Sequence, residues 1–336
     1  MGYINGKKVY NINIIKENGA TFTPHVSEDG VISWTNNKGL ENPPPVNIKG
    51  AKGEGYTLTE ADKTDIADMV EADFNARLNT IAAARNSFFR GANLGDTVTA
   101  EQWQAIQDGT FDDLWIGDYW EINGVKWRIA AFDYFYRDYY TASDNMAAAN
   151  HHITIVPDTC PDAQYHPMKA DGDISGGYVF SDCKTSLLGG TLAKIHLAFG
   201  EEHIMSYSAA LCNGVTDGKP SAVTNTATSV DLLSEVMLFG RHTVGTADAE
   251  GVYYCAGTSG LTQMPLFALA PEFAQGVDIY REQNLFGYWL RDIAGAGCFS
   301  SVVTMSGLTA KAGASRLDAG GYRPVFNIFN KKLGVE

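Results

Sequence analysis

The sequence predicts an α+β protein with a small all-β N-terminal module, a helical segment and a larger mixed C-terminal domain. Three observations lead to this class. Short runs of alternating apolar and polar residues fill positions 3 to 35, and a stripe with helical spacing begins near Thr59. After Gly91, strand-like and helix-like runs follow one another without regular alternation. A doubly wound parallel sheet would need that alternation, so the class is α+β.

The N-terminal module covers residues 1–40. Its strand-like runs include Val9 to Ile14 and Val31 to Trp34, and Asn-Gly, Asp-Gly and Asn-Asn turns separate them. Three consecutive prolines from Pro43 favour extended backbone, and a glycine-rich stretch follows from Gly50 to Gly55. Residues 41–56 are therefore predicted to form a linker.

Residues 57–88 are predicted to be helical. Thr59 is a candidate N-cap and Asp62 completes a capping box. The apolar stripe consists of Ile66, Val70, Phe74, Leu78 and Ile81. This stripe either docks on the next domain or associates with copies of itself, and its near-heptad spacing is compatible with a trimeric bundle. Periodicity cannot separate these two alternatives.

The C-terminal domain is assigned to residues 89–336. A capping box from Thr99 to Gln102 predicts a short helix that Gly109 ends. Asn123 and Gly124 predict a two-residue type I′ turn between two apolar strands. Further helices are expected over residues 183–199 and 230–239, and further strands over residues 153–156, 252–255 and 325–329.

Composition excludes several classes of partner. The 336-residue chain has a formal net charge of −14, so it lacks the basic excess that binds nucleic acid or anionic membranes. No apolar run follows Met1 and none reaches membrane-spanning length, so we expect neither a signal peptide nor membrane insertion, and synthesis in the bacterial cytoplasm. The five cysteines show no metal spacing and are expected to be reduced thiols.

No common catalytic signature is present, so we expect no catalytic residues, metal or cofactor. Asp171 and Asp173 resemble the start of a calcium loop, but the later ligands are absent and a polar turn is favoured. His151, His152, His196 and His203 are expected to cap or pack. The aromatic run from Phe132 to Tyr140 suits sugar stacking or protein contacts, but an aromatic core with a hairpin end is favoured because strands are rich in aromatic residues.

The most unusual segment lies between two aromatic and arginine-bearing clamps near the C-terminus. One clamp runs from Tyr288 to Arg291, and the other runs from Tyr322 to Pro324. From Asp292 to Gly321, eighteen of the thirty residues are Gly, Ala, Ser or Thr. Such residues bury little apolar area, so the clamps and not this segment are expected to stabilise the domain.

These features resemble the C-type-lectin-like variable proteins that retroelements diversify, of the major tropism determinant type. The resemblance rests on Trp289-Leu290-Arg291, the glycine-rich interior and the closing Gly321-Tyr322-Arg323-Pro324. The family usually has Trp and Val where this chain has Tyr288 and Tyr322, and both changes keep an apolar body. Upstream segments, including residues 90–135, resemble tail proteins of phages and prophages of gut Firmicutes.

The resemblance implies a phage tail receptor-binding protein or adhesin whose C-type-lectin-like domain shows a diversifiable face, at about 288–324, to a host cell-surface protein or glycan. It further implies a virion location, a homotrimer, contacts with other tail proteins and attachment through the N-terminal module. The implied ligand-binding positions are Asp292, Gly295, Gly297, Cys298, Ser300, Ser301, Val303, Thr304, Ser306, Leu308, Ala310 and Lys311. The implied frame positions are Trp289, Leu290, Arg291, Phe299, Val302, Arg323 and Pro324.

Two alternatives stay open at this point. The chain is a structural tail or baseplate component without a receptor, or it is an enzyme of the formylglycine-generating type, which shares the lectin-like architecture. The enzyme would need a reactive cysteine pair, for which Cys255 and Cys298 are the candidates. A face of small residues lacks the Trp, Tyr and Arg of strong hot spots, so we expect weak single-site binding strengthened by several copies.

Overall fold

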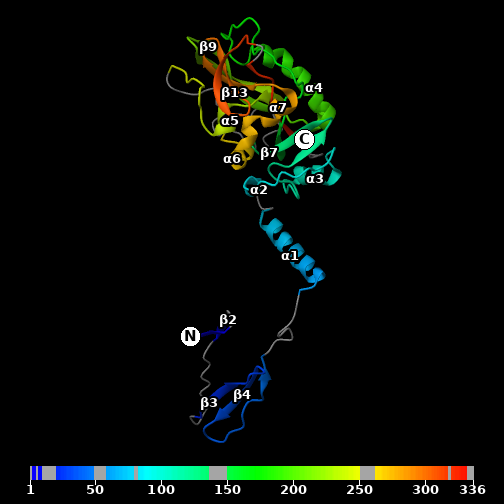
Figure 1. Cartoon of the computed structure of the whole chain (residues 1–336), viewed down its shortest axis with the longest axis vertical. Helices are drawn as coiled ribbons and strands as arrows, with labels where there is room; N and C mark the ends of the chain where they lie inside the picture. Colours follow the sequence, from blue (N-terminus) through cyan, green and yellow to red (C-terminus); the bar gives the residue numbers. More distant parts are fainter. Residues whose placement is uncertain are drawn as a thin grey trace. The chain divides into compact units, whose positions relative to one another are not determined.

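The structure, a computed structural model, describes residues 2–4, 7–9, 20–48, 58–78, 82–135, 150–249, 262–316 and 319–330 (Figure 1). The chain divides into two compact units, Met1–Glu71 and Ala72–Glu336, and each is described by itself. The boundary between them falls within helix α1 (Glu60–Leu78).

The first unit contains short antiparallel strands. They are β1 (Gly2–Ile4), β2 (Lys7–Val9), β3 (Phe22–Val26), β4 (Val31–Asn36) and β5 (Val46–Asn47). β1 pairs with β2, and a three-stranded sheet has the order β3-β4-β5. Within residues 20–48 only Ala20 and Gly30 are buried, so this sheet has almost no core of its own.

Strand β5 lies inside the predicted linker of residues 41–56, which therefore is not extended spacer throughout. Val31 pairs with Asn47 and Ile32 pairs with Val46, because β4 offers an open edge of backbone N–H and C=O groups. The sequence pattern missed this strand because two residues are too few to show alternation.

The predicted helix of residues 57–88 contains α1 and the short α2 (Ala82–Arg85), and residues 79–81 lie outside the described part of the chain. The predicted capping box is confirmed. The hydroxyl of Thr59 accepts a hydrogen bond from the backbone N–H of Asp62 at 3.1 Å, and the Asp62 carboxylate accepts one from the Thr59 N–H at 3.0 Å.

The second unit mixes helices with antiparallel sheets, which confirms the α+β class at this level. Its helices after α2 are α3 (Ala100–Asp108), the π-helix η3 (Cys183–Leu187), α4 (Leu188–Phe199), η4 (Glu201–His203), α5 (Glu235–Phe239), α6 (Pro265–Leu269), η6 (Pro271–Gln275) and α7 (Val277–Gln283). Its strands are β6 (Tyr119–Ile122), β7 (Val125–Phe132), β8 (His152–Pro157), β9 (Tyr207–Thr216), β10 (Lys219–Thr228), β11 (Val230–Leu232), β12 (Gly287–Gly295), β13 (Cys298–Val303), β14 (Leu308–Gly313) and β15 (Pro324–Phe329).

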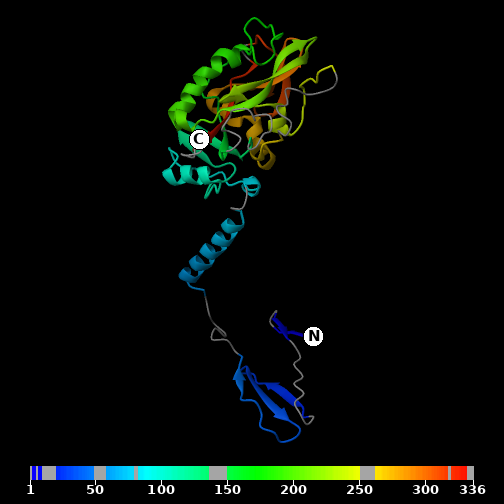
Figure 2. The same cartoon turned by 180° about the vertical axis from the view of Figure 1, so that it is seen from behind.

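Three antiparallel sheets organise this unit. The largest has the strand order β11-β15-β8-β7-β6, a second has the order β12-β13-β14, and β9 pairs with β10 as a hairpin. One apolar core joins the five-stranded sheet, the three-stranded sheet and helix α4. Helix α4 lies along the outer side of the unit in Figure 2, with its buried residues Ile195 and Phe199 in the core.

Several local predictions are confirmed. Thr99 caps α3 with a complete capping box, and Gly109 ends that helix with a left-handed φ of 73°. Asn123 and Gly124 both have positive φ, as a type I′ turn requires, and Trp120 pairs with Trp127 beside it. The predicted strands at 153–156 and 325–329 are β8 and β15.

The prediction of a helix over residues 230–239 is wrong at its start. Val230 to Leu232 form strand β11, which pairs with β15, and Ser234 then caps the short helix α5. A segment of three residues, here Val230-Asp231-Leu232, is too short for its pattern to separate helix from strand, and pairing with the edge of β15 decided for the strand. The long β9–β10 hairpin was not predicted, and the expected strand over residues 252–255 lies outside the described residues.

Candidate ligand-binding face

The two C-terminal clamps meet in space, because the first clamp is part of strand β12 and the second begins beside one edge of that strand. Tyr288 forms a parallel bridge with Gly321, and the backbone N–H of Trp289 donates to the Gly321 carbonyl at 3.0 Å. On its other edge β12 pairs with β13. The two ends of the small-residue segment therefore lie side by side at β12, and the sheet β12-β13-β14 starts there.

Hydrogen bonds to backbone carbonyls, in addition to apolar packing, fix the positions of the aromatic frame residues. The indole N–H of Trp289 donates to the His166 carbonyl at 2.7 Å, and the Tyr288 hydroxyl donates to the Ala274 carbonyl at 2.6 Å. Burial raises the pKa of Tyr288 to about 12, against the lowering effect of Arg323. Tyr288 and Tyr322, which depart from the family pattern, are both fully buried, so they pack as frame residues.

Arg291 reaches into the core and forms an ion pair there. Its Nη1 atom lies 3.3 Å from a carboxylate oxygen of Asp231, and both side chains are buried. Asp231 also accepts a hydrogen bond from the Tyr178 hydroxyl at 2.5 Å and lies 3.5 Å from Lys184 Nζ. Within the described residues, Nε and Nη2 of Arg291 are buried and have no hydrogen-bond acceptor, so Asp231 has more polar partners than Arg291.

A second buried cluster lies beneath β13. Glu235 accepts hydrogen bonds from the backbone N–H groups of residues 243–245 and from the Ser300 hydroxyl. Asp292 accepts one from the Glu235 N–H at 2.8 Å, and His242 Nδ1 lies 3.7 Å from Glu235 and 3.8 Å from Asp292. The cluster ties the loop after α5 to strands β12 and β13.

The pKa values of the two carboxyl groups in this cluster are shifted in opposite directions. Burial, together with the nearby charge of Glu235, raises the pKa of Asp292 to about 7. Burial also works to raise the pKa of Glu235, but nearby His242 and hydrogen bonds from Ser300 and the loop N–H groups lower it to about 2. Glu235 therefore carries a negative charge near neutral pH, where Asp292 is partly protonated.

The structure divides the twelve predicted ligand-binding positions by exposure. Four are buried, namely Asp292, Ser300, Ser301 and Thr304. Four are partly buried, namely Gly295, Gly297, Cys298 and Ala310, and four are exposed, namely Val303, Ser306, Leu308 and Lys311. The frame positions Trp289, Leu290, Arg291, Phe299, Val302, Arg323 and Pro324 are all buried.

The four buried positions are therefore a correction to the expected face. Ser300 and Asp292 point into the acid cluster, and the Thr304 hydroxyl donates to the Leu285 carbonyl at 2.9 Å. Register also separates Lys311 from Leu308, because Lys311 pairs with Ser300 whereas Leu308 pairs with Val303. Residues three apart on a strand face opposite sides, so these two cannot contact one small ligand surface together.

The exposed end of the β13–β14 hairpin carries an apolar surface. We name it the hairpin face and define it as Phe286, Val303, Met305, Ser306 and Leu308. The exposed fractions are 58% for Phe286, 40% for Val303, 49% for Met305 and 67% for Leu308. The Thr304 N–H donates to the Phe286 carbonyl at 3.0 Å, which brings Phe286 beside the hairpin.

Sequence reasoning missed Phe286 and Met305 as members of this face. Met305 sits at the hairpin turn with a φ of 68°, and Phe286 precedes the glycine that opens β12. Both are large apolar residues next to glycine or serine, which marks a turn but does not show exposure. Their exposure depends on the packing of distant segments.

The other candidate groups were placed as follows. Asp171 and Asp173 accept hydrogen bonds from backbone N–H groups two residues further along the chain, as in a polar turn. His203 stacks on Trp103 at 3.9 Å between ring centroids. No group of three or more His, Cys, Asp or Glu residues in the described part of the chain has the arrangement of a metal site.

The aromatic run and the cysteines show no active-site geometry in the described residues. Phe132 and Phe135 are buried in the core, and residues 136–140 lie outside the described part. Cys298 is partly buried, and Cys160, Cys183 and Cys212 are buried free thiols. Cys255, the other candidate for a reactive pair, also lies outside the described residues.

Neither a protein-family model, nor a curated protein, nor a solved structure matches this chain. Within the described residues no helix is both long and apolar enough to cross a bilayer. The functional interpretation therefore depends on the residues themselves and on the resemblance of their motifs.

Proposed function

We propose that this chain is a phage tail receptor-binding protein whose second unit is a C-type-lectin-like domain that presents the hairpin face to a host cell-surface ligand. The main supporting observation is that buried and exposed residues are separated around β12. The clamps are buried and bonded to carbonyls from distant segments, while the hairpin they support ends in exposed side chains. A surface of this kind tolerates exchange of side chains because stability comes from elsewhere.

The hairpin face also exposes several large apolar side chains, although a turn at the surface can be formed by polar residues. Four of its five residues are large apolar side chains that are at least 40% exposed. Contiguous exposed apolar residues of this kind typically mark interaction sites in soluble proteins. In this proposal the exchangeable positions are Val303, Ser306 and Leu308, with Lys311 on the opposite side of β14.

A homotrimer in the virion is part of the proposal. The large apolar side chains described in α1 are Ile66, Met69 and Val70, and they are 44%, 64% and 64% exposed. A helix with an exposed apolar stripe gains most of its stability from packing, which copies of the same helix can supply. The N-terminal sheet, with almost no core of its own, is then the attachment point for other tail proteins.

The test is binding of the full-length chain to host cells, measured by flow cytometry with a fluorescent label. We expect V303D and L308D together to reduce cell binding by at least about tenfold, because charged groups replace the apolar centre of the contact. L197D is the matched control, since Leu197 is 77% exposed on α4, away from the hairpin. Both variants should keep the wild-type unfolding temperature.

Wild-type cell binding that survives the double substitution would contradict the proposed face. No binding of the wild-type chain to any host strain would favour the alternative of a structural tail component. Sequencing of the 288–324 region from sibling prophages adds a second test. Substitutions concentrated at Val303, Ser306 and Leu308 support a displayed surface, whereas uniform drift does not.

A further inference from the structure

A cavity of about 290 Å³ lies beside the second clamp, outside the hairpin face. Asp158 after β8, the segment 272–278 of η6 and α7, and Arg323 before β15 line it. This volume is at the small end of ligand pockets, so the cavity suits one residue of a larger ligand.

Arg323 gives the cavity a buried positive charge. The side chain is 1% exposed, and its Nε and Nη1 atoms donate to the carbonyls of Pro157 at 2.8 Å and Phe273 at 2.7 Å. Its guanidinium also lies 5.2 Å from the ring centre of Tyr288. Within the described residues no carboxylate forms an ion pair with Arg323. Its neighbours are the two carbonyls and the Tyr288 hydroxyl, which carry no formal negative charge, so the positive charge of Arg323 is left for a ligand to balance.

The one buried carboxylate in the cavity wall is already neutralised. Asp158 accepts hydrogen bonds from Nε and Nη2 of Arg128, the first at 2.7 Å, and both side chains are buried. Arg128 does not itself line the cavity, but it neutralises Asp158, so the buried part of the wall keeps the positive charge of Arg323. A carboxylate from a ligand would balance this charge and match the planar geometry of the arginine nitrogens.

The outer wall has a different chemistry. Glu272 is exposed and Asp278 is partly buried, and their oxygens can accept hydrogen bonds from ligand hydroxyl groups. Water and salt screen these outer charges more strongly than the buried guanidinium, so they do not cancel its attraction for an anion. Phe273 and Val277 add apolar surface against which a ring can pack.

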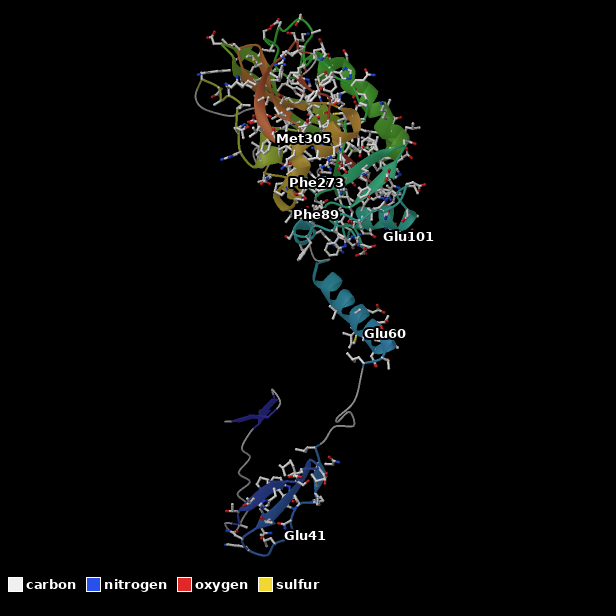
Figure 3. The ribbon with its side chains drawn as sticks, viewed as in Figure 1. Glu41, Glu60, Phe89, Glu101, Phe273 and Met305 are labelled. Atoms are coloured by element: carbon white, nitrogen blue, oxygen red, sulfur yellow. The ribbon has the colours of Figure 1, made fainter. Side chains whose placement is uncertain are left out.

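The cavity adjoins the hairpin that carries the proposed ligand-binding face. A Cβ atom at Gly276 would lie 3.3 Å from the Thr304 side chain, and the Met305 N–H donates to the Gln275 carbonyl at 2.9 Å. Phe273 and Met305 are labelled in Figure 3. A chain-like ligand lying on the hairpin face can therefore place one residue in the cavity.

We propose that this cavity binds a carboxylated sugar residue of the hexuronic acid type, with its carboxylate on Arg323 and its hydroxyl groups toward Glu272 and Asp278. The inference rests on the proposed function and names its ligand class as an acidic surface glycan. The apolar wall and the outer acceptors favour a sugar over a simple anion.

The test is calorimetric titration of the full-length chain with sodium D-glucuronate, D-glucose, sodium acetate and sodium phosphate. We expect glucuronate to bind at about millimolar concentration and the other three probes to bind at least about tenfold more weakly. V277W places an indole in the cavity and should remove glucuronate binding. L197W is the matched control and should leave it unchanged.

A second variant keeps the test decisive if V277W disturbs the fold. The double substitution E272Q and D278N changes only the outer wall, and we expect it to weaken glucuronate binding about fivefold without changing the response to acetate. Glucose binding as tight as glucuronate would overturn recognition of the carboxylate. Phosphate binding as tight as glucuronate would reduce the site to a general anion site and overturn recognition of the sugar.

Unchanged glucuronate binding in folded V277W, or in the outer-wall variant, would also overturn the proposal. The proposed function fails separately, through cell binding that is insensitive to V303D and L308D. Loss of cell binding in those variants, combined with no glucuronate binding by the wild-type chain, would reject the sugar site and retain the hairpin face.

Discussion

Replacing Asp292 by asparagine should change the pH dependence of stability in a defined direction. Asp292 is 1% exposed, and its pKa is raised from 3.8 to about 7 by burial and by the charge of Glu235. An acid with a raised folded-state pKa binds its proton more tightly in the folded protein than in the unfolded one. Its contribution therefore destabilises the fold increasingly as pH rises from the unfolded pKa through the folded pKa.

The magnitude follows from these two pKa values. At 1.36 kcal/mol per pKa unit, ionisation of Asp292 removes about 2–3 kcal/mol of folding free energy between about pH 5 and pH 8. Asparagine does not titrate, and its side-chain oxygen can still accept the hydrogen bond from the Glu235 N–H. D292N should therefore gain stability relative to wild type by about this amount across the same interval.

The assay is urea unfolding of both proteins at several pH values, followed by tryptophan fluorescence. L197N serves as a surface control, because Leu197 is 77% exposed. A D292N minus wild-type difference that stays constant from acid to mildly alkaline pH would refute the reasoning.

Three further predictions concern contacts inside the second unit. D231L should cost about 3–5 kcal/mol because it leaves buried Arg291 without its carboxylate, whereas R291M should cost less because Asp231 keeps two other partners. Chemical denaturation gives both values, and equal costs would contradict the asymmetry. W289F should cost about 1–3 kcal/mol by orphaning a buried carbonyl, as measured by the shift in urea midpoint. G218A should destabilise by roughly 1–3 kcal/mol, because Gly218 has a φ of 75° and a Cβ there would lie 2.4 Å from the Ala296 nitrogen. A thermal shift of zero for G218A would mean that the two turns do not touch.

Glu235, in the same cluster, affects the stability of the protein at low pH. Its pKa is lowered to about 2 by hydrogen bonds that outweigh burial, so its stabilising contribution is present above its unfolded pKa and is lost as pH falls through the folded value. As pH rises, ionisation of Asp292 thus lowers the free energy of unfolding, whereas ionisation of Glu235 raises it. Single substitutions separate the two effects.

Local sequence signals determined those parts of the fold whose physics is local. Thr59 and Thr99 cap helices because a hydroxyl can reach N–H groups two or three residues away, and Asn123-Gly124 turns because both residues tolerate positive φ. The class of α+β follows from the same short-range patterns. The two clamps were recognisable because large aromatic and arginine residues frame a segment of small ones.

Only the tertiary structure decided which residues of that segment reach the surface. Ser300 and Asp292 are buried because Glu235, 65 and 57 residues away along the chain, lies against them. The cavity at Arg323 combines Asp158 with segments that lie more than a hundred residues further along the chain, and Arg323 is held there by carbonyl partners at Pro157 and Phe273. Exposure and charge balance are properties of packed surfaces, and a one-dimensional pattern records only which side chains are available to form them.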